Sequence, residues 1–78
     1  MAEIEGVRRT LFVLELTGRA GVMTVKKLAE QSEWTKPSAC RYLRDICEAG
    51  WLERVNEKGA PKYVLGRKAL TFAPEIRL

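Results

Sequence analysis

TKPSACRYLRD, residues 35–45, combines the residues that start a helix with two arginines spaced along it. Thr35 can cap a helix, and Pro37 suits the first turn because no backbone N–H is needed there. At about 100° per residue, one side of this helix carries Ala39, Tyr42, Leu43 and Ile46, and the opposite side carries Pro37, Arg41, Arg44 and Glu48. The stretch therefore predicts a helix that stops at Glu48 or Ala49 before Gly50, buries one side and displays cations on the other.

Two more helices are predicted upstream of this one. Thr24 can cap a short helix from Val25 to about Ser32, and GVM, residues 21–23, can form a short strand before it. From Ala2 to Thr17 the apolar residues keep helical spacing, with Gly18 as the expected C-cap. This first helix carries more apolar surface than one small core needs, so core packing and contact with a second subunit both remain open for it.

A β-hairpin is predicted downstream. Residues 51–55 alternate as a strand does, NEKGAP (56–61) supplies turn residues, and KYVL (62–65) returns to Gly66. Residues 67–72 are expected to form one last helical turn before Pro74, and residues 75–78 to fray. This order of elements predicts a mainly helical α+β fold, a winged helix-turn-helix with a three-helix core and a C-terminal β-hairpin wing. We expect one domain over 1–78, with the first helix at 1–18, the helix-turn-helix at 24–50, the wing at 51–66 and a short helix and tail at 67–78.

The charge is uneven along the chain. Fourteen Lys and Arg against ten Asp and Glu give the 78 residues a net charge of +4. Residues 36–44 hold three cations and no acid, and residues 54–68 hold five cations and one acid, so these two stretches carry +7 and the remainder −3. Such a distribution suits an acidic partner, although local clusters also occur by chance in any small basic protein.

Composition argues against several other classes of protein. A chain this short buries a small core and has little room for a deep catalytic cleft, and it contains no His and no phosphate-cradling glycine loop, so we expect no enzyme and no cofactor. Cys40 and Cys47 are about 10 Å apart along one helix, too far for a disulfide, and they cannot complete a zinc site. No stretch predicts a signal peptide or a membrane span, so we expect a cytoplasmic, nucleoid-associated protein.

The helix-turn-helix and wing resemble the DNA-binding domain of the IclR-type bacterial regulators. The matching positions are Thr24, Leu28, Ala29, Lys36, Ser38, Arg41, Tyr42, Leu43, Gly50, Tyr63, Leu65 and Gly66, and the likeness spans about residues 7–72. The chain departs from the family pattern at Glu33, where Gly is usual, at Pro37 and at Cys40. The family also carries a large effector-binding domain that these 78 residues lack, which implies either a stand-alone protein or an excised domain, and no small-molecule effector.

The arginines of residues 35–45 are the predicted base-reading groups, because an arginine fork can hold O6 and N7 of guanine in the major groove. Arg41 and Arg44 take this role, and a solvated face or an ion pair with Asp45 or Glu48 is the alternative. Thr35, Lys36 and Ser38 stand at the helix start, where a phosphate is favoured, although capping alone would also explain Thr35.

The remaining predicted contacts come from the core edge and the hairpin. The Tyr42 hydroxyl is free to meet a phosphate, and Lys58, Lys62 and either Arg67 or Lys68 could follow the DNA backbone. Charge at a hairpin tip also serves solubility. For Trp34 and Trp51, core packing is favoured over base stacking.

These features predict sequence-specific binding of double-stranded DNA by a small transcriptional repressor of bacterial or phage type. One such module makes few base contacts, so we expect a homodimer on a pseudo-palindromic site, joined through the first helix and the tail. A DNA-handling accessory factor for packaging or recombination would use the same residues, and a winged helix that docks only to protein is the other alternative.

Overall fold

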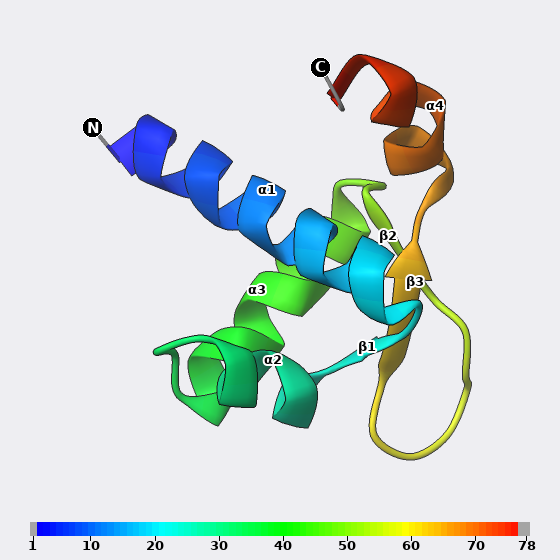
Figure 1. Ribbon diagram of the computed structural model, residues 1–78. Helices are drawn as coiled ribbons and strands as arrows, with labels where there is room; N and C mark the ends of the chain where they lie inside the picture. The colour runs from blue at the N-terminus through cyan, green and yellow to red at the C-terminus, as the bar shows by residue number, and fades with distance from the viewer. Residues whose placement is uncertain (1, 77–78) are drawn as a thin grey trace.

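The computed structural model describes residues 2–76. Its elements follow the chain as α1 (Ala2–Ala20), β1 (Met23–Thr24), α2 (Val25–Gln31), α3 (Lys36–Glu48), β2 (Leu52–Arg54), β3 (Lys62–Leu65) and α4 (Arg67–Ile76). Figure 1 shows α1 crossing in front of α3, with the loop of the β2–β3 hairpin at one end of the sheet and α4 at the other. The fold is a mainly helical winged helix-turn-helix, as the sequence predicted.

Local signals explain the start of both helices of the helix-turn-helix. The Thr24 side chain accepts a hydrogen bond from the Lys27 N–H at 3.1 Å, and that of Thr35 accepts one from the Ser38 N–H at 3.3 Å. Each hydroxyl thereby satisfies an N–H that the helix itself leaves unpaired. The predicted N-caps of α2 and α3 are therefore confirmed, as is Pro37 in the first turn of α3.

The turn between α2 and α3 forms without a left-handed residue. All positive-φ residues in the described part of the chain are glycines, so Glu33, which stands where the family usually has Gly, keeps an ordinary backbone conformation. Ser32 accepts a hydrogen bond from the Trp34 N–H at 3.2 Å. A side-chain turn thus closes this connection where a glycine would otherwise be expected.

Two predicted helix boundaries are wrong. α1 passes through Gly18 and ends at Ala20, and the glycine in the left-handed region is Gly21, with φ of 84°. α4 continues through Pro74 to Ile76, because a proline removes one hydrogen bond without preventing helical backbone angles. The expected fraying of residues 75–78 is therefore wrong for Glu75 and Ile76, and Arg77 and Leu78 lie outside the described residues.

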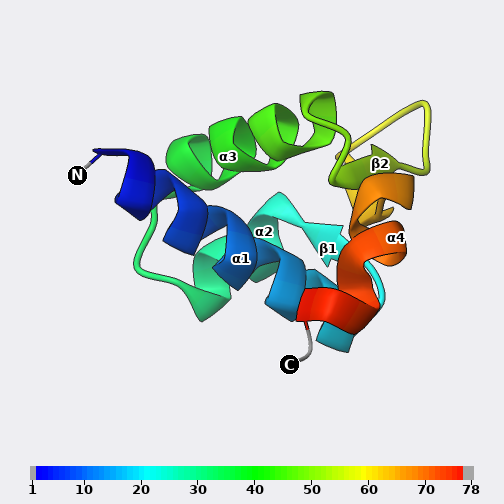
Figure 2. The ribbon, with the colours of Figure 1, turned by 90° about the horizontal axis from the view of Figure 1, so that it is seen from above.

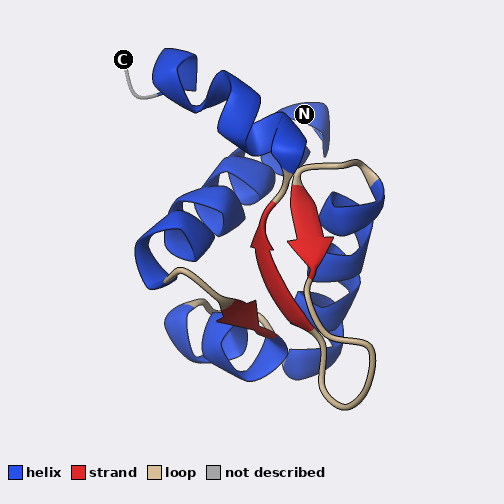
Figure 3. Ribbon diagram, turned by 90° about the vertical axis from the view of Figure 1, so that its right-hand side faces the viewer, coloured by secondary structure: helices blue, strands red, loops and turns tan. Residues whose placement is uncertain are grey.

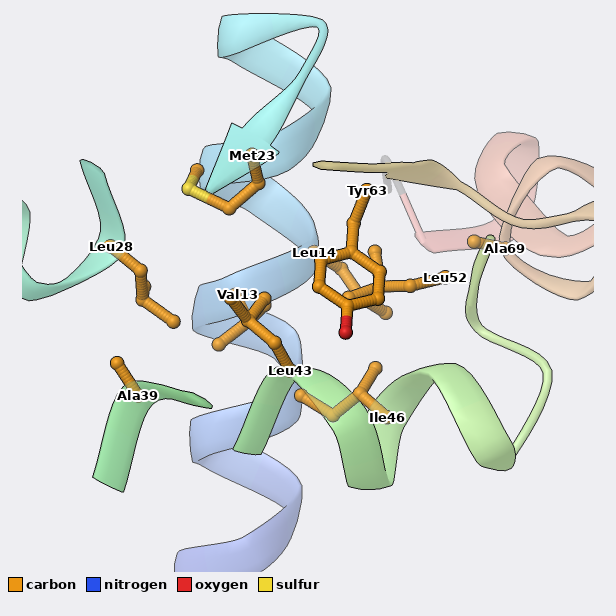
Figure 4. Packing of buried hydrophobic residues seen from close by; sticks show 10 residues of the cluster. All are labelled: Val13, Leu14, Met23, Leu28, Ala39, Leu43, Ile46, Leu52, Tyr63 and Ala69. Atoms are coloured by element: carbon orange, nitrogen blue, oxygen red, sulfur yellow. The ribbon is translucent and has the colours of Figure 1, made fainter. Parts of the chain in front are cut away.

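The hairpin belongs to a three-stranded antiparallel sheet of order β1-β3-β2. β3 is central: Met23 pairs with Tyr63 on one side, and Leu52, Glu53 and Arg54 pair with Leu65, Val64 and Tyr63 on the other. Figure 3 shows the sheet between α1 and α2 on one side and α3 on the other. Residues from the helices and the sheet form one core: Val13, Leu14, Met23, Leu28, Ala39, Leu43, Ile46, Leu52, Tyr63 and Ala69 (Figure 4).

Candidate nucleic-acid interface

The apolar side of α3 anchors the helix and fixes which side faces solvent. Ala39 and Leu43 are fully buried and Ile46 nearly so, while Arg41 and Arg44 are exposed. Figures 2 and 3 place α3 and the loop of the hairpin on the same side of the molecule, opposite α1. α3, which carries Arg41 and Arg44, and the hairpin loop, which carries Lys58, therefore lie on one side of the molecule.

Arg41 and Arg44 are not neutralised by the acids of their own helix. Among residues 5–71, whose side chains are described, the ion pair that forms is Arg19 with Glu15, at 3.5 Å between Nη2 and Oε1. Asp45 and Glu48 form none with either arginine of α3 in this part of the chain. Both guanidinium groups of α3 keep their charge available for an external anion or a base edge.

An aromatic cluster supports the start of α3. The Tyr42 ring lies edge-on to Trp34 with centroids 4.9 Å apart, and Trp34 lies edge-on to Phe12 of α1 at 5.6 Å. The Arg41 guanidinium carbon is 5.5 Å from the Tyr42 ring centroid, and that of Arg9 is 4.2 Å away. Trp34 thus packs as predicted, and Tyr42 holds one cation from α3 and one from α1 by cation–π attraction.

The hydroxyl groups at the start of α3 are already engaged with each other. Thr35 Oγ1 accepts from the Ser38 N–H and donates to Ser38 Oγ at 3.2 Å. Lys36 is exposed beside them. Of these three predicted phosphate contacts, Lys36 has the least constrained side chain, whereas Thr35 has a structural role as cap.

Asn56 organises the loop between the strands. Its side-chain amide donates to the carbonyls of Lys58 at 2.9 Å and Ala60 at 2.8 Å, and its oxygen accepts from the Lys62 N–H at 2.9 Å. Arg54 adds bonds of 3.3 Å to the Asn56 oxygen and to the Gly59 carbonyl. The loop is thus fixed by side-chain hydrogen bonds, with Lys58 exposed on it and Lys62 exposed at the start of β3.

The two cations after the hairpin differ in role. Lys68 donates to the Ala49 carbonyl at 3.1 Å and lies 5.3 Å from the Trp51 ring centroid, so it ties α4 to the end of α3. The prediction that Lys68 could follow the DNA backbone is not supported by this placement. Arg67 is exposed at the start of α4, at the opposite end of β3 from Lys62 (Figure 1).

Two arginines near this surface were not predicted. Arg9 stands three residues before Phe12 on α1, a spacing that places both on one side of the helix and that could have revealed it. Arg54 pairs with Tyr63 across the sheet. The predicted strands 51–55 and 62–65 around the turn 56–61 already imply this register, because loop length fixes the register of a hairpin, so the sequence could have revealed Arg54.

The described residues hold neither a cluster of metal ligands nor a helix suited to span a membrane. Among them, no three His, Cys, Asp or Glu side chains gather where a metal ion could bind, and both cysteines are free thiols. None of the helices in residues 2–76 combines the length and the apolar character needed to cross a bilayer.

Comparison with known proteins supplies the family. No curated protein and no solved structure is significantly similar to the chain. Residues 6–56, from α1 through β2, match the model of the IclR helix-turn-helix domain, whereas the expected likeness extended to about residue 72. Since this match covers more than half of the chain and the fold agrees with it, the chain belongs to the IclR helix-turn-helix family, a family of DNA-binding transcription regulators.

Proposed function

We propose that this protein binds specific sequences of double-stranded DNA and represses transcription by occluding a promoter. The observation that carries the proposal is the exposed side of α3, where Arg41 and Arg44 make no ion pair in the described part of the chain. α3 enters the major groove in this proposal and its arginines read guanine edges. Lys36, Lys58 and Lys62 contact phosphates, and Ser38, Tyr42 and Arg67 are supplementary contacts.

Two variants separate base reading from phosphate contact. Replacing Arg44 by Ala should relax base preference by about 1–3 kcal/mol at one position, because a bidentate contact is lost. Replacing Lys58 by Ala should weaken binding to every sequence and reduce the slope of log K against log salt by about one. Duplexes selected from a random pool supply the site, and mobility shifts at several salt concentrations measure both effects.

Arg19→Ala is the matched control, because it removes an exposed cation from the end of α1 that is already paired with Glu15. It should leave sequence preference unchanged. Intact specificity in Arg44→Ala would contradict the base-reading role. Binding that does not respond to salt between 50 and 200 mM would favour a protein-docking module.

The proposal includes a homodimer on a pseudo-palindromic site and needs no small-molecule effector. Val7 and Leu11 of α1 are 58% and 47% exposed, which is unusual for large apolar residues so close together. They line a groove of about 440 Å³ between α1 and α3, together with Leu14, Ile46 and Trp51. An apolar groove of this kind supports burial against a second copy of the chain.

Sedimentation tests the dimer. The wild-type chain should sediment as a dimer at tens of micromolar, and Leu11→Glu should shift it to monomer because a carboxylate would be buried in the interface. Val22→Glu, at a 37% exposed residue outside the groove, is the control and should remain dimeric. A wild-type monomer at these concentrations would refute the dimer.

A further inference from the structure

The junction between α3 and the hairpin holds a group of donors that the predicted site residues do not include. The register of the sheet places Arg54 directly opposite Tyr63, so both side chains lie on the same face. Leu52, two residues before Arg54, is buried on that face. Arg54 therefore leaves the sheet on its core side, at the end nearer the loop.

The Tyr63 hydroxyl reaches the edge of the core. The residue is only 5% exposed, and Figure 4 shows its ring among the core residues with the hydroxyl directed toward α3. In the described residues this hydroxyl makes no hydrogen bond, yet every fully buried side-chain oxygen or nitrogen there has a partner. The oxygen must therefore touch solvent, at the boundary between α3 and the sheet.

Cations of both neighbouring elements act on this hydroxyl. Burial raises the pKa of Tyr63 above its ordinary value, the Cys47 and Cys40 thiols raise it further, and Arg54 and Arg44 oppose them. The hydroxyl is thus protonated at neutral pH and can donate.

Arg54 also has donors to spare. A guanidinium group carries five N–H donors, and Arg54 uses one for the Asn56 oxygen and one for the Gly59 carbonyl. Arg44, on the neighbouring turn of α3, is exposed and makes no ion pair with the described side chains of residues 5–71. At this junction the Tyr63 hydroxyl and the unused N–H groups of Arg54 can donate hydrogen bonds to an anion. Arg44 adds a second positive charge beside them.

We propose that the Tyr63 hydroxyl and the Arg54 guanidinium together bind one phosphate of the DNA backbone, where the strand passes between α3 and the hairpin. The inference rests on the proposed DNA-binding function and adds a phosphate contact that fixes the register of α3 beside the base-reading Arg44. A phosphodiester suits the site because its oxygens accept hydrogen bonds and its charge matches the cations.

The test compares Tyr63→Phe and Arg54→Gln with the wild-type chain on a selected duplex. Tyr63→Phe removes only an oxygen and should weaken binding about tenfold, the usual effect of losing a hydrogen bond to a charged group, with no change in salt slope. Arg54→Gln should weaken binding to a similar extent and lower the salt slope by about one. Thermal unfolding of both variants checks that the fold is retained.

A methylphosphonate scan then identifies the phosphate. Neutralising phosphates one at a time in the duplex should reveal one position at which the wild-type chain loses affinity and both variants lose none. A merely loosened loop in Arg54→Gln would weaken binding without removing the sensitivity to that phosphate. Arg19→Gln removes an equivalent charge elsewhere and should keep the wild-type pattern.

The outcomes separate this inference from the function on which it rests. Suppose that the wild-type chain binds a selected duplex. If Tyr63→Phe and Arg54→Gln then bind it as tightly as the wild type, or lose their sensitivity to methylphosphonate at different phosphates, the inference is overturned while the proposed function stands. If the wild-type chain binds no duplex, the proposed function and the inference are overturned together.

Discussion

The order of charges along α3 disfavours ion pairs between its arginines and its own acids. Arg41 and Asp45 are four residues apart, as are Arg44 and Glu48, and in both cases the arginine comes first. Glu15 and Arg19 have the same spacing in the opposite order, and there the ion pair forms. An acid on the N-terminal side gives the better geometry and also complements the helix dipole. The favourable order does not by itself produce a pair, because Arg9 follows Glu5 at the same spacing and lies over the Tyr42 ring instead. In α3 the unfavourable order accompanies arginines that Asp45 and Glu48 leave unpaired.

A titration prediction follows for Tyr63. Because burial raises its pKa in the folded state, the folded chain holds this proton more tightly than the unfolded chain does. The resulting stability is fully present below the unfolded pKa of about 10 and is lost as pH rises through the folded pKa. Urea unfolding between pH 8 and 11 should show Tyr63→Phe losing less stability than the wild-type chain. An equal loss in both would contradict the prediction, since the lysines titrate in both.

At the level of elements, the hairpin loop holds its shape through one side chain. Asn56 pairs with three backbone groups of residues 58–62, and Gly59 supplies the left-handed residue of the turn, with φ of 82°. A loop ordered before it meets DNA loses less conformational entropy on binding. The placement of Lys58 therefore depends on Asn56.

Asn56→Ala should remove these bonds and loosen the loop. We expect a loss of about 1–3 kcal/mol in the free energy of unfolding and faster exchange of the Lys62 N–H. Asn56→Asp keeps the oxygen that accepts from Lys62 and should retain slow exchange at that amide. Unchanged exchange in Asn56→Ala would show that other contacts hold the loop. Denaturant unfolding and amide hydrogen exchange give the two measurements.

On the scale of the whole molecule, Gly66 marks the point where three segments converge. Its N–H donates to the Trp51 carbonyl at 2.9 Å, and α4 begins at the next residue. A Cβ atom at Gly66 would stand 2.7 Å from the Gly50 carbonyl oxygen and about as close to the backbone of Trp51 and Leu52. Backbone atoms cannot move aside as a flexible side chain can, so glycine is required here by space rather than by φ.

Gly66→Ala should accordingly destabilise the fold by about 1–3 kcal/mol, the usual cost of overpacking a core. Gly6→Ala is the matched control, because nothing lies within 4 Å of its Cβ and alanine favours the helix by up to about 1 kcal/mol. Denaturant unfolding of the two variants should move the midpoint in opposite directions. A Gly66→Ala chain as stable as the wild type would mean that the end of α3 and the hairpin can separate.

The sequence by itself determined the helix-turn-helix and the exposed side of α3. The caps at Thr24 and Thr35, the left-handed Gly50 and the period of Ala39, Leu43 and Ile46 act over a few residues, so they can be read locally. The family resemblance shares Thr24, Leu43 and Gly50 with these signals and adds positions in the wing.

Only the tertiary structure decided where distant segments meet. The pairing of β1 with β3 and the bond from Lys68 to Ala49 each join residues whose sequences carry no local sign of one another. The end of α1 is a similar case, since a Cβ atom at Gly18 would lie 3.5 Å from the Leu65 side chain and Gly21 makes the turn. Local sequence preferences determine where helices and turns begin and end. The contacts between these elements depend instead on how all of them pack together into one hydrophobic core.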